Sequence, residues 1–301
     1  MASSPDKEPR AGTAPDVALR LIVAGCRADL VKYRAVVATS RRSIGIHQTR
    51  VALRRLRAAF SLFRGAVDGP PGAALSAEAK WLAGECAPAR DLHVFLTETV
   101  SDVPPLVRRV SNRLAAAHLE RARAALAGAH FTAFDRQLSA FAAKSPVATP
   151  PAKSPAPALR LDDFGRGVLE TRHRKVIRRA HRLEQLDSER LHRLRIAIKK
   201  LRYAATYLRP AFASATFASP AAKAYIEATV RLQGALGALN DRPAAAQVVA
   251  DLALAARPTE DVTQPLKVLA KQAASGGKRR RRRLERAWKD FRKAERFWRR
   301  A

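Results

Sequence analysis

An eleven-residue pattern that occurs twice limits how this chain can fold. The first copy runs from His47 to Arg57 (HQTRVALRRLR) and the second from His192 to Arg202 (HRLRIAIKKLR). In both copies the histidine is followed by arginine at +3, basic residues at +7 and +8, leucine at +9 and arginine at +10. A pattern repeated at this length predicts two copies of one structural unit within the chain.

Each copy predicts a helix with two different faces. At about 100° per residue, the histidine and the basic residues at +3, +7 and +10 fall within roughly 80° of one another, on a stripe about 15 Å long. Apolar side chains project on another side of each helix: Leu53, Leu56, Phe60 and Phe63 in the first copy, and Leu194, Ile198, Leu201 and Leu208 in the second. We therefore expect each helix to bury its apolar side and to turn its cationic stripe toward a binding partner.

The composition predicts an all-α protein. Ala, Leu, Arg and Glu dominate, while clusters of aromatic and β-branched residues are sparse. A hydrophobic content of 47% is typical of a globular chain. Each half of the chain contains about four apolar-periodic segments, which favours two four-helix bundles. One of these segments, residues 73–100, should be kinked or interrupted at Pro88.

The predicted domain organisation follows the prolines. The polar N-terminal residues contain three prolines and predict a disordered tail, and a second proline-rich segment predicts a stiff, extended linker between two helical halves. A second landmark, Arg90-Asp91 in one half and Asn240-Asp241 in the other, has nearly the same spacing as the two histidines, which supports an internal duplication. The expected boundaries are a tail over 1–15, a helical half over 16–144, a linker over 145–160 and a helical half over 161–301.

The charge predicts a polyanionic partner. The chain has 57 Lys and Arg against 26 Asp and Glu, a net charge of +31, and such self-repulsion is typical of proteins that bind nucleic acid, anionic membranes or polyphosphate. Arg or Lys interrupts every apolar run before the ~20 residues that a membrane span needs. The first residues contain no hydrophobic signal core, so we expect a cytoplasmic protein. In that compartment Cys26 and Cys86 should be reduced core thiols.

Further short motifs are spread over nearly the whole chain: Arg90-Asp91-Leu92, Leu232-Gln233, Leu236-Gly237, Asn240-Asp241 and Phe297-Trp298. Together with the two eleven-residue copies, they resemble the CHAD family, the conserved histidine α-helical domain. The resemblance implies two four-helix bundles related by pseudo-two-fold symmetry around a basic central groove or pore. It also implies non-catalytic binding of inorganic polyphosphate, association with polyphosphate granules, and no cofactor.

The chemistry of polyphosphate suits the two stripes. The ligand carries roughly one negative charge per phosphate and has no bases, so a line of forked arginine cations is a good receptor for it. A neutral imidazole can donate one hydrogen bond to phosphate, and a bound anion would favour the protonated form. The expected polyphosphate-binding residues are His47, Arg50, Arg54, Arg55, Arg57, Arg90, His192, Arg195, Lys199, Lys200 and Arg202.

Other interpretations of these residues remain open. Each histidine could be a hydrogen-bonded residue at a bundle seam, whereas a metal site is disfavoured because no carboxylate or thiolate accompanies the histidines. A nonspecific nucleic-acid-binding protein is the main alternative, with Arg279 to Arg283 as its patch, although aromatic residues make up only 6% of the chain and no nucleic-acid-binding motif is found. The arginine run from Arg279 to Arg283 could equally be the exposed start of a helix.

The sequence also bears on two further functions. The Ala-rich amphipathic helices are compatible with a surface protein of a polyhydroxyalkanoate storage granule. A phosphohydrolase, or a protein that uses His47 as a phosphoacceptor, is disfavoured because the sequence has no P-loop and no paired carboxylates suited to Mg²⁺.

Overall fold

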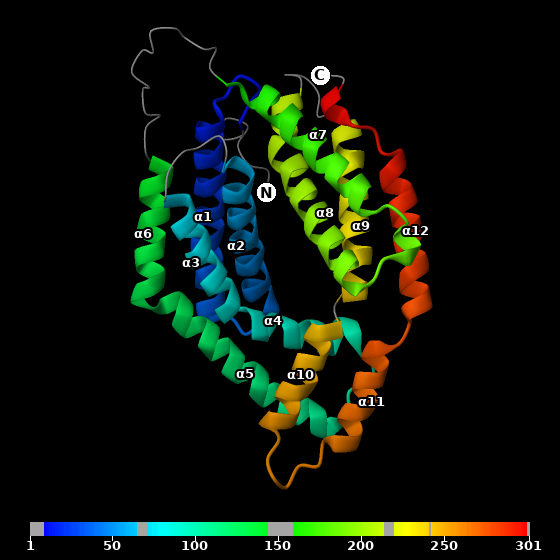
Figure 1. Cartoon of the computed structure of the whole chain (residues 1–301). Helices are drawn as coiled ribbons and strands as arrows, with labels where there is room; N and C mark the ends of the chain where they lie inside the picture. Colours follow the sequence, from blue (N-terminus) through cyan, green and yellow to red (C-terminus); the bar gives the residue numbers. More distant parts are fainter. Residues whose placement is uncertain (1–8, 65–70, 144–158, 214–219, 241, 300–301) are drawn as a thin grey trace.

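The computed structural model describes residues 9–64, 71–143, 159–213, 220–240 and 242–299 (Figure 1). All the regular secondary structure of these residues is helical. The first half contains α1 (Pro15–Thr39), α2 (Ser43–Phe63), α3 (Pro71–Glu85), α4 (Ala87–Val94), α5 (Pro105–Ala127) and α6 (Ala129–Ala143). The second half contains α7 (Leu161–Arg179), α8 (Ser188–Leu208), α9 (Pro220–Asn240), α10 (Arg242–Ala255), α11 (Thr263–Ala274) and α12 (Gly277–Lys293). Short π and 3₁₀ segments complete the described chain: η2 (Phe95–Thr99), η3 (Leu183–Gln185), η4 (Arg209–Phe212) and η5 (Phe297–Arg299). The predicted all-α fold class is confirmed.

Residues with known helix-starting preferences mark several of these boundaries. Asp187 caps α8, because its Oδ1 accepts a hydrogen bond from the backbone N–H of Arg190 at 2.7 Å. Pro105 occupies the first turn of α5, where a missing N–H costs nothing. The segment predicted over 73–100 breaks at Cys86, and Pro88 lies in the first turn of α4, so the predicted interruption is confirmed.

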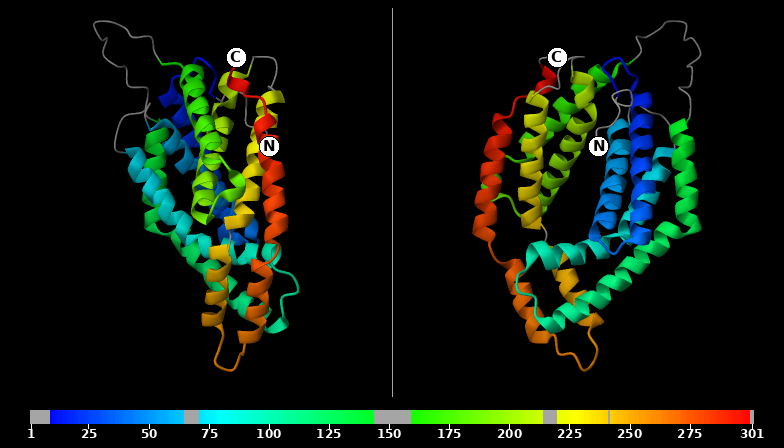
Figure 2. Two further views of the ribbon diagram at one scale, coloured as in Figure 1. Left: turned by 45° about the vertical axis from the view of Figure 1, so that its right-hand side comes forward. Right: turned by 180° about the vertical axis from the view of Figure 1, so that it is seen from behind.

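Two bundles stand side by side in the upper part of the molecule. Figures 1 and 2 show α1, α2, α3 and α6 on one side and α7, α8, α9 and α12 on the other. Their buried residues form one contiguous hydrophobic cluster. The apolar sides predicted for the two motif helices are confirmed, since all eight residues of the predicted set are buried: Leu53, Leu56, Phe60, Phe63, Leu194, Ile198, Leu201 and Leu208.

A third group of helices, which the sequence did not predict as a unit, forms the base of the molecule. Here α4, η2 and the beginning of α5 pack against α10 and α11 around a separate core that includes Leu92, Phe95 and Val107 from the first half and Val248 and Leu266 from the second (Figure 1). The sequence did not predict α11 at all. Because α4 crosses beneath the lower end of α2, its side chains can reach the same space as the stripe of the motif helix.

The two halves use their helices in the same order. In each half the first, second, third and sixth helices belong to an upper bundle, and the fourth and fifth belong to the base (Figure 1). The two motif helices, α2 and α8, are each 21 residues long and each is the second helix of its half. This order is compatible with the predicted internal duplication, which remains a prediction.

The structure adds detail at the predicted tail and linker. The described part of the tail, from Pro9, forms a turn against the start of α7, where Leu161 N–H donates to the carbonyl oxygen of Thr13 at 3.0 Å. Residues 1–8 and 145–158, which carry the rest of the predicted tail and linker, lie outside the described residues.

The first helix of the second half, α7, ends well before the second motif helix begins. It ends at Arg179, and Arg182 adopts a left-handed conformation with a φ of 51° before the short segment η3. A residue with a side chain and a positive φ cannot continue an α-helix, so the chain turns there.

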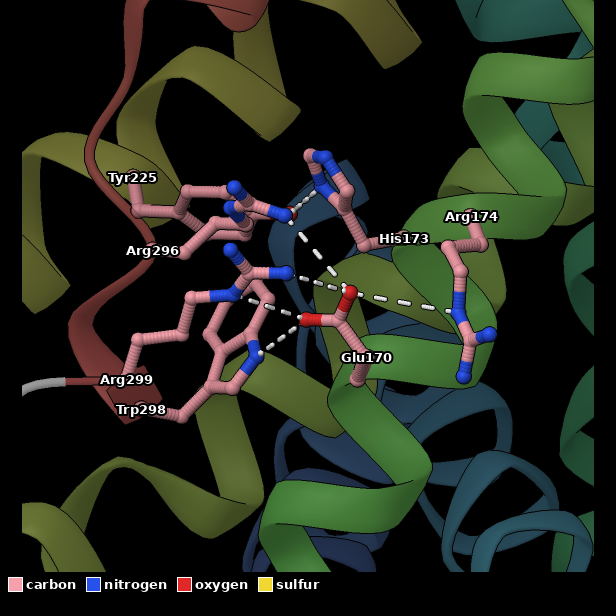
Figure 3. Close-up of polar contacts among 7 residues, drawn as sticks. All are labelled: Glu170, His173, Arg174, Tyr225, Arg296, Trp298 and Arg299. Atoms are coloured by element: carbon pink, nitrogen blue, oxygen red, sulfur yellow. Dashed lines mark hydrogen bonds and ion pairs between the residues drawn. The ribbon is translucent and has the colours of Figure 1, made fainter.

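The C-terminal segment is held against α7 by a cluster of polar contacts around Glu170 (Figure 3). The carboxylate accepts a hydrogen bond from Arg299 at 2.8 Å and one from the indole N–H of Trp298 at 3.2 Å. Arg296 lies 3.6 Å away, also within ion-pair distance. These contacts close the second bundle by fixing the chain end beside its first helix.

Both cysteines are buried free thiols, as predicted. Burial raises the pKa of Cys26 to about 12 and that of Cys86 to about 11, so both remain protonated at neutral pH. Over the part of the chain that the structure describes, no helix combines the length and apolar character required to cross a membrane.

Candidate functional site

The cationic stripe of α2 faces a cavity of about 260 Å³. His47, Arg50 and Arg54 line it from one side, while the apolar side of the same helix is buried in the bundle core. This arrangement follows from the helical period, which separates the two sets of side chains on the helix surface. We call this space the His47 cavity.

Elements from both halves of the chain complete the walls of the His47 cavity. Arg90 and Asp91 come from α4, Arg195 comes from α8, and the remaining lining residues are Val94, Phe95, Thr99, Ala244 and Ala245 of the base group. Among the residues that the structure describes, the cavity lining thus has four guanidinium groups and one imidazole against a single carboxylate. A half-enclosed space with this charge balance concentrates positive potential.

Arg50 is the most constrained cation of the His47 cavity. Its Nη1 donates a hydrogen bond to the carbonyl oxygen of Ala83 at 2.7 Å, and its Nη2 lies 3.9 Å from Oδ1 of Asp91. Burial lowers the pKa of Arg50 and raises the pKa of Asp91, and the charge of each opposes the shift of the other. Asp91 therefore lies where its carboxylate can orient the guanidinium of Arg50.

Arg54 links the two motif helices directly. Its Nε donates a hydrogen bond to the hydroxyl of Tyr203 on α8 at 2.8 Å. Tyr203 is only 5% exposed, and the guanidinium of Arg202 lies over its ring, 4.7 Å from the centroid. The tyrosine thus holds one cation from each motif helix.

His47 is neutral at neutral pH in this environment. Burial lowers its pKa below 6.5, and the positive charges of Arg90 and Arg54 lower it further, while Glu98 acts in the opposite direction. A neutral imidazole can donate one hydrogen bond to an anion. An anion that neutralises the surrounding arginines would raise the pKa of His47. It would thereby favour the imidazolium form, which carries a second ring proton and a positive charge.

Lys199 and Arg57 belong to the same positive region. Burial lowers the pKa of Lys199, and the positive charges of Arg195, Arg57 and Arg54 lower it further, so these cations are close enough to act on it. These four residues come from both motif helices. The first and second stripes therefore approach each other at this level of the bundles.

The remaining residues of the expected site lie elsewhere or face differently. Arg55 donates a hydrogen bond to Asp29 of α1 at 2.8 Å and does not line the His47 cavity. Lys200 is exposed, and the cations that act on it are mainly those of α7, led by Arg172 and Lys175, together with Arg64 at the end of α2. His192 is exposed and does not line the His47 cavity. The two stripes are thus equivalent in sequence but not in surroundings.

The structure also identifies cations that the sequence interpretation left open. The start of α12 lines a second cavity, of about 1230 Å³, with six basic side chains: Lys278, Arg279, Arg280, Arg282, Arg283 and Arg286. Arg279, Arg282, Arg283 and Arg286 are spaced three or four residues apart in the sequence. This spacing indicates that their side chains lie on one face of a helix. It did not indicate what that face would meet.

The described residues contain no group of three or more His, Cys, Asp or Glu side chains that could hold a metal ion. In the His47 cavity the donor set is cationic, with Asp91 beside Arg50. These donors suit an anion rather than a cation.

Comparisons with known proteins agree on the fold. The crystal structure of the CHAD domain from the plant Ricinus communis matches with a TM-score of 0.78 at 23% sequence identity, covering 96% of this chain and 95% of that one. PptA from Streptomyces chartreusis matches with a TM-score of 0.58 at 15% identity, covering 93% of this chain and 98% of that one. No curated protein matches in the sequence comparison. A family model for the CHAD domain matches residues 21–250, well over half of the chain, and the protein therefore belongs to the CHAD domain family.

Proposed function

We propose that this protein binds inorganic polyphosphate in the His47 cavity, without cleaving it, and that binding directs the protein to polyphosphate granules. The CHAD family is linked to polyphosphate binding in general. The observation that carries the proposal for this chain is the convergence of Arg50, Arg54 and Arg90 from the first half with Arg195 from the second around one cavity.

The cavity suits a chain of linked phosphates better than a single small anion. Arginine forks donate two hydrogen bonds to one phosphate or bridge neighbouring ones. The four arginines and His47 come from three different helices, so they surround the ligand instead of approaching it from one side. The half-open cavity leaves a long anion free to continue beyond it.

A binding role without cleavage fits the donor chemistry. Hydrolysis of a phosphoanhydride with bound Mg²⁺ requires carboxylates that are free to hold the ion. Among the described residues that line the His47 cavity, Asp91 is the one carboxylate, and it already lies beside Arg50. Incubation of the purified protein with polyphosphate and Mg²⁺ or Mn²⁺ tests this part: phosphate release that depends on Asp91 would contradict it.

The binding site is tested with a variant that removes charge but not structure. Arg54→Gln, Arg195→Gln and Lys199→Gln take three cations from the region where the two stripes meet, and leave Arg50, with its bond to Ala83, in place. We expect the affinity for long-chain polyphosphate, measured by calorimetric titration, to fall by more than roughly tenfold, with a shallower dependence on salt.

A matched control separates the site from the general positive charge. Arg108→Gln, Arg109→Gln and Arg178→Gln remove three exposed cations from other surfaces of the molecule. We expect this variant to bind almost as the unmodified protein does. Equal affinity of the two triple variants would mean that binding depends on net charge alone and that the His47 cavity is not the site. Granule association is tested by comparing the cellular distribution of the same two variants.

A further inference from the structure

A second concentration of cations lies in the cavity beside the start of α12. Its six basic side chains face a space of about 1230 Å³ whose other walls come from η2, α9 and the end of α11. We call it the arginine cavity. These α12 residues lie beyond residues 21–250, the part of the chain that the family model matches.

The arginine cavity adjoins the His47 cavity. Val94, Thr99 and Ala245 line both spaces. Arg90 lines the His47 cavity and Glu98 lines the arginine cavity, and the two side chains form an ion pair at 3.1 Å. The path between the two spaces therefore follows α4 and η2, with this ion pair at the boundary.

The opposite direction is unfavourable for an anion. A third cavity, of about 150 Å³, also adjoins the His47 cavity, with which it shares Asp91 and Ala244. Its ionisable lining residues are Asp91, Asp251 and His118, and burial lowers the pKa of His118, so the imidazole is neutral. A polyanion that leaves the His47 cavity meets carboxylates on this side and arginines on the other.

The position of the arginines is not explained by the stability of α12. The first turn of this helix contains no acidic residue, although acidic residues favour the positive end of the helix dipole and cations oppose it. Leu284, Ala287 and Phe291 already anchor the helix by burial on its other face. Cations that are unfavourable for the helix and mutually repulsive point to a ligand that compensates their charge.

We propose that the arginine cavity is a second subsite for the same phosphate chain, which continues past Val94 and Thr99 from the His47 cavity. This inference rests on the proposed function. The favoured ligand is then a linear polyphosphate long enough to occupy both subsites, whereas a short one occupies the His47 cavity alone. The length preference of the protein is set by α12 and the affinity for short chains by the two motif helices.

The test uses two triple variants of α12 in the full-length protein. Arg279→Gln, Arg283→Gln and Arg286→Gln remove three exposed cations of the arginine cavity. Lys289→Gln, Arg292→Gln and Lys293→Gln remove three exposed cations from the other end of the same helix and serve as the control. The ligands are tripolyphosphate, long-chain polyphosphate and a DNA duplex, each titrated at the same low salt concentration. Thermal unfolding of both variants verifies that they are folded.

We expect the cavity variant to bind tripolyphosphate as the unmodified protein does, and long-chain polyphosphate at least roughly tenfold more weakly with a smaller salt dependence. The control variant should retain both affinities. Unchanged long-chain affinity in the cavity variant overturns the second subsite. A loss confined to DNA also overturns it, and identifies a nucleic-acid patch instead. If the unmodified protein binds neither polyphosphate, the proposed function itself is wrong, which is a different outcome.

Discussion

Arg54 of one motif helix donates a hydrogen bond to the hydroxyl of Tyr203 on the other, at 2.8 Å. The two helices come from different halves of the chain, and the bond holds a cavity cation at the place where the halves meet. A few residues further along α8, the hydroxyl of Tyr207 donates to the carbonyl oxygen of Arg55 at 2.8 Å. Both tyrosines therefore form a hydrogen bond between α2 and α8. We expect the loss of the Tyr203 bond to affect ligand binding and the loss of the Tyr207 bond to affect stability.

Replacing Tyr203 by Phe should weaken polyphosphate binding and leave the fold intact. The change frees the guanidinium of Arg54 but retains the ring over which Arg202 lies. We expect the affinity to fall by about two- to fivefold, as for the loss of one orienting hydrogen bond. Tyr207→Phe is the matched control: it should lower the free energy of unfolding by about 1 kcal/mol and leave the affinity unchanged. Calorimetric titration and denaturant unfolding of both variants measure the two effects, and a reversed pattern would contradict this assignment.

Replacing Glu98 by Gln should strengthen binding. Glu98 is 58% exposed and pairs with Arg90 at 3.1 Å, so it competes with a bound anion for that arginine. Exposed ion pairs are weak, so a gain in affinity of about two- to fivefold is expected. Glu120→Gln removes one negative charge from an exposed pair with Arg123 and is the control. An equal gain in both variants would show an effect of net charge only.

Binding should strengthen as the pH falls, through His47 and not through His192. In the free protein, burial and the neighbouring arginines hold the pKa of His47 below 6.5, and a bound anion raises it. Binding therefore takes up a proton, and the affinity should rise as the pH is lowered from about 8 to about 5.5. Long-chain polyphosphate suits the titration because few of its phosphates are terminal groups that titrate near roughly pH 6.

Two single variants identify the histidine responsible for this pH dependence. His47→Gln should flatten the pH profile of binding, whereas His192→Gln, at an exposed position outside the cavity, should leave it unchanged. A profile that depends equally on both histidines would support the symmetric site expected from the sequence.

The stability of the second bundle should decrease in mild acid because of His173. This side chain is 9% exposed and shares a hydrogen bond of 2.8 Å with the hydroxyl of Tyr225 (Figure 3). Burial, followed by the charge of Arg296, lowers the pKa of His173 to about 4. The unfolded chain takes up a proton as the pH falls below 6.5, but the folded protein does so only near 4, so the folded state loses stability across this interval.

The expected loss is about 3 kcal/mol between about pH 6.5 and pH 4. His173→Gln keeps a hydrogen-bonding group beside Tyr225 but removes the titration. Urea unfolding over this pH range should show a steeper decline for the unmodified protein than for the variant. Parallel declines would mean that the pKa of His173 does not differ between the folded and unfolded states as described.

The sequence alone determined the helical fold class and the faces of the motif helices. Period and composition were sufficient for this, because a helix of 3.6 residues per turn separates Leu53 and Leu56 from Arg50 and Arg54 whatever the helix packs against. The interruption at Pro88 was equally local, since proline removes a backbone donor wherever it occurs.

Only the tertiary structure decided which cations share a cavity. Arg195 reaches the His47 cavity while His192, three residues earlier, is exposed, and this difference depends on how α4, η2 and α10 of the base group pack beneath the bundles. The base group itself joins segments far apart in the chain, and a local pattern contains no information about such pairings. For the same reason the sequence left the arginine run of α12 open between a nucleic-acid patch and an exposed helix start, whereas in the fold it lines a cavity beside the predicted site.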